Sequence, residues 1–201
     1  RKFIREGTAI GVSATALAGV GAQEANAQGR IKWDRMADVV IVGAGASGLP
    51  AAIMARDKGV SVIVIDQNHD IGGHAMLSGG RVPLGGGTSH QKKYGIMDSA
   101  DQVYLDHTNH KDSEFRYADR DLVRMWADEN VPTFEFLIEN GVKFVDVKPS
   151  LVNEGTVPRL VVAQVFSPDL NETINGSPGS GVVRPLEKSA RAKGVEILLQ
   201  H

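Results

Sequence analysis

The sequence predicts an α/β fold built on a parallel sheet. Three apolar runs rich in β-branched residues, at 38–42, 60–65 and 195–199, have the length and composition of strands that such a sheet buries on both faces. A glycine-rich turn and an alanine-rich helical segment separate the first two runs, which is the order of a βαβ unit. The third run follows an amphipathic helical segment at 182–193, so we expect it beside the second strand in the same sheet.

The turn after the first strand, Gly43-Ala44-Gly45-Ala46-Ser47-Gly48, matches the pattern G-x-G-x-x-G. In this pattern the first glycine allows a tight turn, the second lets the backbone approach a pyrophosphate, and the third lets the helix pack closely on the strand. The helical segment that follows holds Pro50 in its first turn, where a missing N–H costs little, and Gly59 ends it. Unpaired N–H groups at the start of this helix, together with its dipole, would hold the phosphates.

Asp66 ends the second strand, where a carboxylate can accept hydrogen bonds from both hydroxyls of a ribose. An acid at this place favours a ribose with an unmodified 2′-hydroxyl, as in FAD or NAD, over NADP. The pattern has its strand before it, its helix after it and its acid where expected, so it predicts a Rossmann-like dinucleotide-binding domain. The alternative is a structural glycine turn with a surface aspartate.

The segment after Asp66 distinguishes FAD from NAD. An NAD-binding Rossmann domain continues from its second strand into a crossover helix, whereas here Gly72-Gly73 and Gly79-Gly80 fall within nine positions and disfavour a regular helix. We expect a glycine loop that crosses the top of the sheet and contacts a long cofactor, which favours FAD. A flexible surface loop is the alternative for this segment, and an NAD-linked dehydrogenase is the alternative for the protein.

These residues resemble the flavoprotein subunits of the fumarate reductase/succinate dehydrogenase superfamily, in the style of soluble fumarate reductases, urocanate reductases and 3-ketosteroid dehydrogenases. The resemblance is carried by residues 40–66, Gly72-Gly73-His74-Ala75 and Ser78-Gly79-Gly80, and it continues with gaps to Gly179-Ser180-Gly181 and residues 185–197. It implies an FAD-dependent oxidoreductase that transfers a hydride between the flavin and a carbon of a small organic or steroid-like substrate. A small-molecule substrate and an electron donor or acceptor protein are the implied partners.

The resemblance also implies roles for single residues. Asp66 stands where the family has its ribose-binding acid, more often glutamate, and Gln67 lies near the adenine, where a basic residue is common. His74 stands at a position usually held by Asn, Ser or Thr and can hydrogen-bond the cofactor, and Ser78-Gly79-Gly80 would run beside the isoalloxazine. No catalytic acid or base can be assigned in this sequence. The expected cofactor-binding residues are Gly43, Ala44, Gly45, Ala46, Ser47, Gly48, Asp66, Gln67, Gly73, His74, Ala75, Ser78, Gly79 and Gly80.

Helical spacing continues through the middle of the sequence. It predicts helices at 99–110 and 119–130, then a third helix that Pro132 opens and Gly141 caps, with a short strand possible at 142–145. The apolar residues of these helices indicate a packed helical core rather than cofactor contacts.

Residues 38–201 are therefore assigned to one FAD-binding domain with a helical and irregular insertion at about 98–180, part of a substrate-capping region. The last strand would be a newly added interior strand, so we expect the domain to continue beyond His201. A non-catalytic, truncated flavoprotein fragment is a further alternative for these 201 residues by themselves.

Four polar residues between positions 107 and 184 are candidate ligands. His107 and His110 lie three positions apart, but without a third ligand they indicate a solvated polar face rather than a metal site. Arg159 and Arg184 could meet an anionic substrate, although an exposed arginine is the default expectation.

Composition excludes several classes of function. The net charge of −2 gives no basic excess of the kind that a nucleic-acid-binding surface needs. The sequence holds no cysteine, which excludes disulfides, thiolate metal sites and a cysteine nucleophile from this stretch.

Residues 1–28 have the layout of an export signal, and 29–37 form a linker. A basic start at Arg1-Lys2-Phe3-Ile4-Arg5 precedes a weakly apolar run that is too short, and too rich in glycine and alanine, to span a bilayer stably, and Ala25-Asn26-Ala27 offers a cleavage site. The start resembles a twin-arginine signal whose first arginine is missing, which predicts an exported protein, periplasmic or extracytoplasmic. A disordered or helical tail is the alternative.

Overall fold

The structure, a computed structural model, describes residues 33–109, 117–152, 156–165 and 178–201. All helices and strands named below lie in the unit formed by residues 37–201. The predicted export signal and His110 lie outside the described residues.

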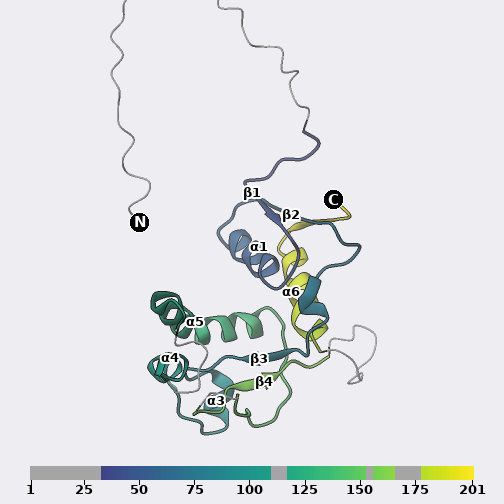
Figure 1. Cartoon of the computed structure of the whole chain (residues 1–201). Helices are drawn as coiled ribbons and strands as arrows, with labels where there is room; N and C mark the ends of the chain where they lie inside the picture. The colour runs from purple at the N-terminus through teal and green to yellow at the C-terminus, as the bar shows by residue number, and fades with distance from the viewer. Residues whose placement is uncertain (1–32, 110–116, 153–155, 166–177) are drawn as a thin grey trace, which may run out of the picture. The chain divides into compact units, whose positions relative to one another are not determined.

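The main sheet holds three parallel strands, β1 (Val39–Val42), β2 (Val62–Asp66) and β5 (Glu196–Leu199), in the order β1-β2-β5 (Figure 1). In the register, Val40 lies opposite Ile63, and Ile65 lies opposite Leu198. The predicted α/β fold is confirmed, and the last strand lies beside the second as expected.

Two helices cover one face of this sheet. Helix α1 (Gly48–Asp57) connects β1 to β2, and α6 (Ser180–Ala192) leads into β5 and packs against α1. Alternate residues of each strand face these helices, because side chains along a strand point to opposite sides. The core between sheet and helices includes Leu49, Ile53, Val64, Val183, Leu186 and Ile197.

The expectation that β1 is buried on both faces is wrong for the described residues. Val40 is 56% exposed and Val42 is 82% exposed. Both side chains alternate with Val39 and Ile41, which pack against the core that α1 and α6 cover. No described element covers the opposite face at β1, which is an edge strand of the described sheet.

The glycine segment after β2 contains one helical turn that the sequence did not predict, α2 (Gly73–Met76). Strand β3 (Arg81–Pro83) follows it and pairs with β4 (Leu160–Val162) as an antiparallel two-stranded ribbon (Figure 1). A short helix, α3 (Ser89–Lys93), comes after the ribbon's first strand. Residues 72–80 thus form no crossover helix, as predicted, but they are more ordered than a simple loop.

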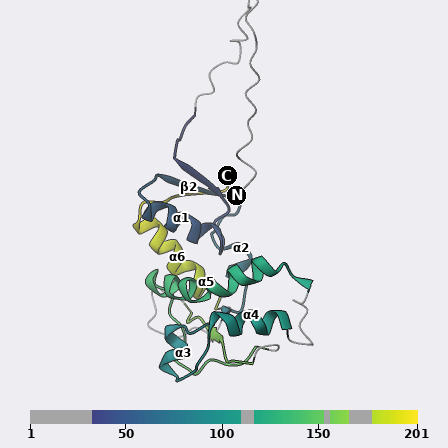
Figure 2. The ribbon, with the colours of Figure 1, turned by 90° about the vertical axis from the view of Figure 1, so that its left-hand side faces the viewer.

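The helical region contains α4 (Ala100–Asn109) and α5 (Arg120–Glu139), which lie side by side (Figure 2). The predicted break at Pro132 is wrong, because α5 is one continuous helix of 20 residues. Proline removes one backbone hydrogen bond, but α5 buries Ala127 before it and Phe134 after it, so packing keeps both halves in one helix. Among the described residues, no helix is long and apolar enough to cross a membrane.

The strand predicted as possible at 142–145 does not form. Phe144 makes only an isolated antiparallel bridge to Ala163, and its ring stacks on Phe134 of α5 with ring centroids 4.8 Å apart. Two backbone hydrogen bonds accompany this bridge, from Val145 N–H to the Val162 carbonyl at 2.9 Å and from Gln164 N–H to the Lys143 carbonyl at 2.7 Å, so the pairing is too short to form a strand.

Candidate functional site

The turn between β1 and α1 is shaped by two glycines. Gly43 has φ +101° and donates its N–H to the Ile65 carbonyl at 2.7 Å. A β-carbon added at Gly48 would lie 1.9 Å from the Gly43 carbonyl oxygen, so only glycine lets α1 approach the end of β1 this closely. The helix start is thereby brought directly over the carboxyl end of the strand.

Two other glycines border open space. A β-carbon at Gly45 would meet only the Gly72 carbonyl oxygen, at 3.8 Å, and one at Gly73 would meet nothing within 4 Å. The Gly72 N–H donates to the Ala44 carbonyl at 2.8 Å, and Gly45 and Gly72 form a parallel bridge. The G-x-G-x-x-G turn and the later glycine pair therefore lie together and form an open cradle that side chains would fill.

The N-terminus of α1 is not capped by a side chain. Ser47 occupies the N-cap position but makes no cap hydrogen bond, whereas Asp119 caps α5 and Thr88 forms a complete capping box on α3. The first N–H groups of a helix lack intrahelical acceptors, and with the helix dipole they favour an anion. An uncapped helix start beside the open cradle fits the pyrophosphate of a dinucleotide.

Asp66 lies buried at the end of β2. One carboxylate oxygen accepts the Ala44 N–H at 2.7 Å, and the other accepts the backbone N–H of Asn68 at 2.9 Å and its side-chain amide at 3.0 Å. The backbone N–H of Asn68 is the largest influence on the pKa of Asp66; together with Ala44 it outweighs burial and lowers that pKa. The carboxylate is thus ionised and fixed against the glycine turn, and an ionised carboxylate has lone pairs for further hydroxyl donors.

The segment from Gly73 to Gly80 lies between the end of β4 and the start of α6. Gly80 accepts a hydrogen bond from the Ala163 N–H at 2.9 Å, and the carbonyl of Ser78 accepts one from the Gly179 N–H at 3.0 Å. A β-carbon at Gly179 would lie 2.0 Å from the Ala75 carbonyl, so α6 begins pressed against this segment. His74 itself is exposed.

The predicted cofactor residues thus follow the carboxyl ends of β1 and β2, where ligands bind in open α/β sheets. Gln67 is exposed directly after Asp66. The open cradle, the uncapped helix start and the fixed carboxylate together fit a dinucleotide that carries a ribose and a pyrophosphate. Among the described residues, no group of three or more His, Cys, Asp or Glu side chains could hold a metal ion.

The two arginines predicted as candidate substrate ligands have different surroundings. Arg159 is 1% exposed and pairs with Asp98 and Asp106, so the expectation of an exposed arginine is wrong and it cannot reach a substrate. Arg184 is partly exposed and pairs with Asp70 and, at 3.0 Å, with Glu187. Burial of Arg159 depends on partners more than 50 positions away, and no local signal in the sequence indicates it.

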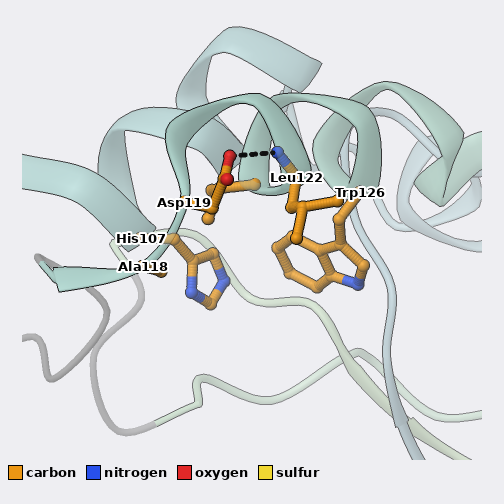
Figure 3. Close-up of a pocket in the computed structure, with 6 residues that line it drawn as sticks. His107, Ala118, Asp119, Leu122 and Trp126 are labelled. Atoms are coloured by element: carbon orange, nitrogen blue, oxygen red, sulfur yellow. Dashed lines mark hydrogen bonds between the residues drawn. The ribbon is translucent and has the colours of Figure 1, made fainter. Parts of the chain in front are cut away.

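A cavity of about 400 Å³ lies at α4 and α5 (Figure 3). His107 lines it and meets the Trp126 ring edge-on, with centroids 4.5 Å apart, so His107 is half-buried against an indole rather than on a solvated face. None of the predicted cofactor residues lines the cavity, which is therefore separate from the glycine cradle. The lining residues are His107, Ala118, Asp119, Leu122, Val123 and Trp126.

Comparisons with known proteins agree with this geometry. A family model described as FAD binding domain matches residues 38–201. The chain is 29% identical over 197 residues to the acrylate reductase flavoprotein subunit of Shewanella woodyi, covering 97% of this chain and 35% of the relative. It is 30% identical over 161 residues to the urocanate reductase of Eggerthella lenta, covering 80% and 24% respectively.

A comparison with solved structures also finds a ketosteroid dehydrogenase. The structure of 3-ketosteroid-Δ4-(5α)-dehydrogenase from Rhodococcus jostii RHA1 in complex with 4-androstene-3,17-dione superimposes with a TM-score of 0.68 at 26% identity. The match covers 87% of this chain and 40% of that one. The chain thus spans well under half the length of each of these relatives.

Proposed function

The chain belongs to the FAD binding domain family, and on this premise we propose that the whole protein transfers a hydride between FAD and a carbon of a small organic or steroid-like substrate. FAD is the cofactor, as the family and the flavoprotein relatives indicate. When bound, it supplies a hydride donor or acceptor at flavin N5. In the reductive direction one carbon of an activated C=C bond would receive the hydride and the other a proton, and an external donor would return two electrons to the flavin, which would also take up a proton.

The observation that carries this proposal is the open glycine cradle next to an uncapped helix. In our proposal the N–H groups of the turn at 43–48 bind the pyrophosphate, and Asp66 accepts hydrogen bonds from the ribose. Gln67 would lie near the adenine, residues 73–75 would contact the cofactor, and residues 78–80 would run beside the isoalloxazine. The chain's own contribution is therefore to hold and orient the cofactor.

An NAD-linked dehydrogenase is less well supported. Such a domain would continue from Asp66 into a crossover helix, but the next helix, α2, has only four residues and leads into β3. The family match also names FAD rather than a nicotinamide cofactor.

The relatives suggest the class of substrate. Acrylate, urocanate and 4-androstene-3,17-dione, the compounds in the names of three of them, each contain a C=C bond conjugated to a carbonyl group. Conjugation makes the distal carbon of that bond electrophilic. We therefore propose an alkene conjugated to a carboxylate or ketone as the substrate, or its saturated counterpart in the reverse reaction.

The test begins with the absorption spectrum of the protein extended to its natural ends, after removal of unbound flavin. We expect flavin bands, and release of FAD on denaturation. Consumption of acrylate, urocanate or 4-androstene-3,17-dione with a reduced viologen dye as electron donor would then support the reaction. A protein that holds FAD but reduces no such alkene, and dehydrogenates no saturated counterpart, would overturn the proposed activity and leave FAD binding intact.

Export by the twin-arginine route is a separate proposal, supported by the basic, apolar and small-residue parts of residues 1–28. That route exports folded proteins, so FAD could be loaded first. The natural N-terminal region fused to a reporter should bring it across the membrane, and Arg1→Lys should abolish transport. Retention of the unaltered fusion in the cytoplasm would contradict export.

A further inference from the structure

The strongest unexplained feature of the fold is a buried ion cluster formed by Asp98, Arg159 and Asp106. Their side chains are 0%, 1% and 4% exposed. The Arg159 guanidinium donates to both oxygens of Asp98, at 2.8 and 2.9 Å, and to Asp106 at 2.7 Å. None of the three is among the predicted cofactor residues, so FAD binding gives no direct reason for them.

Further donors complete the cluster. Asp98 also accepts the Gly86 N–H at 2.7 Å and the Gln91 side-chain amide at 2.9 Å. Asp106 accepts the Gln102 amide at 2.8 Å and the Thr156 hydroxyl, also at 2.8 Å. Each carboxylate thus accepts hydrogen bonds on both of its oxygens, and such a buried network favours one arrangement of the segments that supply its members.

Two of those segments are the near ends of the β3–β4 ribbon. Gly86 lies in the loop that leaves β3, and Arg159 directly precedes β4. A β-carbon at Gly85 would lie 2.3 Å from the Arg159 side chain, so the loop is pressed against the arginine. The ion cluster therefore fixes β3 and β4 to each other at this end.

The far end of the same ribbon is the segment proposed to border the flavin. The register runs from Pro83 opposite Leu160 to Arg81 opposite Val162, and the next contact is the Ala163 N–H to the Gly80 carbonyl. Three residue pairs separate the cluster from Gly80, roughly 10 Å at about 3.3 Å per residue. Because the strands are paired over this whole length, a shift of Arg159 would also move Ser78-Gly79-Gly80.

We propose that the ion cluster of Asp98, Arg159 and Asp106 is a positioning device that holds Ser78-Gly79-Gly80 in place against the isoalloxazine. The inference rests on the proposed placement of the flavin at residues 78–80. It does not depend on which substrate the protein reduces. If the cluster loosens, the ribbon shifts, and Gly80 moves relative to the fixed pyrophosphate turn.

The test compares Arg159→Lys with Arg124→Lys in the full-length, FAD-loaded protein. Lysine keeps the charge but loses the bidentate contact with Asp98. Arg124 is the matched control, because it also bonds two aspartates, Asp101 and Asp128, but these are exposed and none of the three residues belongs to the ion cluster. The readouts are the dissociation constant for FAD, the shape of the visible flavin bands and the circular dichroism of the fold.

We expect Arg159→Lys to stay folded, to bind FAD about twofold to thirtyfold more weakly, and to change the flavin bands, since loosening a packed network at a distance from a ligand has effects of that order. Arg124→Lys should match the wild type in all three readouts. A folded Arg159→Lys protein with wild-type FAD affinity and bands would overturn the proposal, even if its melting temperature fell. If Arg159→Lys does not fold, Thr156→Val takes its place in the test. This variant removes only the hydroxyl donor to Asp106, and the same readouts and outcomes apply to it.

A second variant separates failure of this inference from failure of the flavin placement. A β-carbon at Gly79 would meet only the Arg81 side chain, at 3.9 Å, so Gly79→Ala should fold normally. If the flavin lies there, Gly79→Ala changes its bands and affinity. Unchanged bands in Gly79→Ala would show that the placement is wrong, and the positioning role would fall with it. Changed bands in Gly79→Ala with unchanged bands in Arg159→Lys would overturn the positioning role alone.

Discussion

Gly48 lies so close to Gly43 that a β-carbon on the first would stand 1.9 Å from the carbonyl oxygen of the second. At Gly45, two residues after Gly43, a β-carbon would meet only ordinary contact at 3.8 Å. Gly48 is therefore required by packing within the fold, whereas Gly45 leaves space for a ligand.

Alanine substitutions should separate the effect on protein stability from the effect on FAD binding. Gly48→Ala should destabilise the FAD-free protein by about 1–3 kcal/mol or more, because backbone must shift to admit the methyl group. Gly45→Ala should change stability by less than about 0.5 kcal/mol. It should weaken FAD binding at least about tenfold, or about 1.4 kcal/mol, because its methyl group enters the cradle. Urea unfolding and FAD titration measure the two effects; normal FAD affinity in Gly45→Ala would contradict the proposed pyrophosphate site.

The caps of two helices give a second prediction. Thr88→Ala removes a complete capping box from α3 and should lower the free energy of unfolding by about 1 kcal/mol. Ser47→Ala removes a hydroxyl that caps nothing in α1 and should lower it by less than about 0.5 kcal/mol. Both are measured without FAD by urea unfolding. Equal losses for the two variants would show that Ser47 does cap its helix.

The cost of breaking a charge pair should depend on its burial. Arg159→Met leaves Asp98 and Asp106 buried without their cation, and we expect a loss of about 3–5 kcal/mol. Arg124→Met breaks pairs with two exposed aspartates and should cost about 0–1 kcal/mol. Chemical denaturation of the two variants at pH 7 gives the comparison. Similar losses would mean that water reaches Arg159.

The same cluster predicts a dependence of stability on pH. Burial raises the pKa of Asp106, but hydrogen bonds from Arg159, Thr156 and Gln102 outweigh it, so the pKa in the folded state lies below its ordinary value. Between the folded value and the unfolded value, about 3.9, the unfolded chain binds more protons, and stability rises with pH. The contribution of Asp106 is thus fully present above about pH 5 and is lost as the pH falls through the folded value.

Asp106→Asn isolates this contribution from that of other carboxylates. The difference in unfolding free energy between wild type and Asp106→Asn should be largest near neutral pH and should shrink below about pH 4. A difference that stays constant from pH 3 to pH 7 would show that Asp106 titrates normally in the folded protein.

The parts of the fold that the sequence predicted are those with a contiguous local pattern. The apolar runs of β1, β2 and β5 and the glycine after α1 mark their elements within a few residues. Pro132 misled the prediction because proline usually ends a helix, while the buried residues on either side of it in α5 are visible only once the helix is packed. The three-residue strand β4 carries too short a pattern to be recognised.

The candidate site also has parts that the sequence predicted and parts that it did not. The turn at 43–48 and Asp66 follow from spacing alone, because turn, helix start and strand end are neighbours in sequence. The burial of Arg159 in an ion cluster cannot be predicted from spacing, because its partners Asp98 and Asp106 lie 61 and 53 positions away. Gly179 and Gly181 entered only as part of the family resemblance, yet α6 needs both to begin against Ala75 and Gln164.

The exposed valines of β1 have a practical consequence for work with these 201 residues expressed alone. An edge strand that presents Val40 and Val42 to water offers both unpaired backbone groups and apolar surface to a second molecule. At the concentrations used for crystallisation or NMR such a surface favours self-association and precipitation. A lysine in place of Val42, the more exposed valine, would make the isolated piece more soluble and easier to handle.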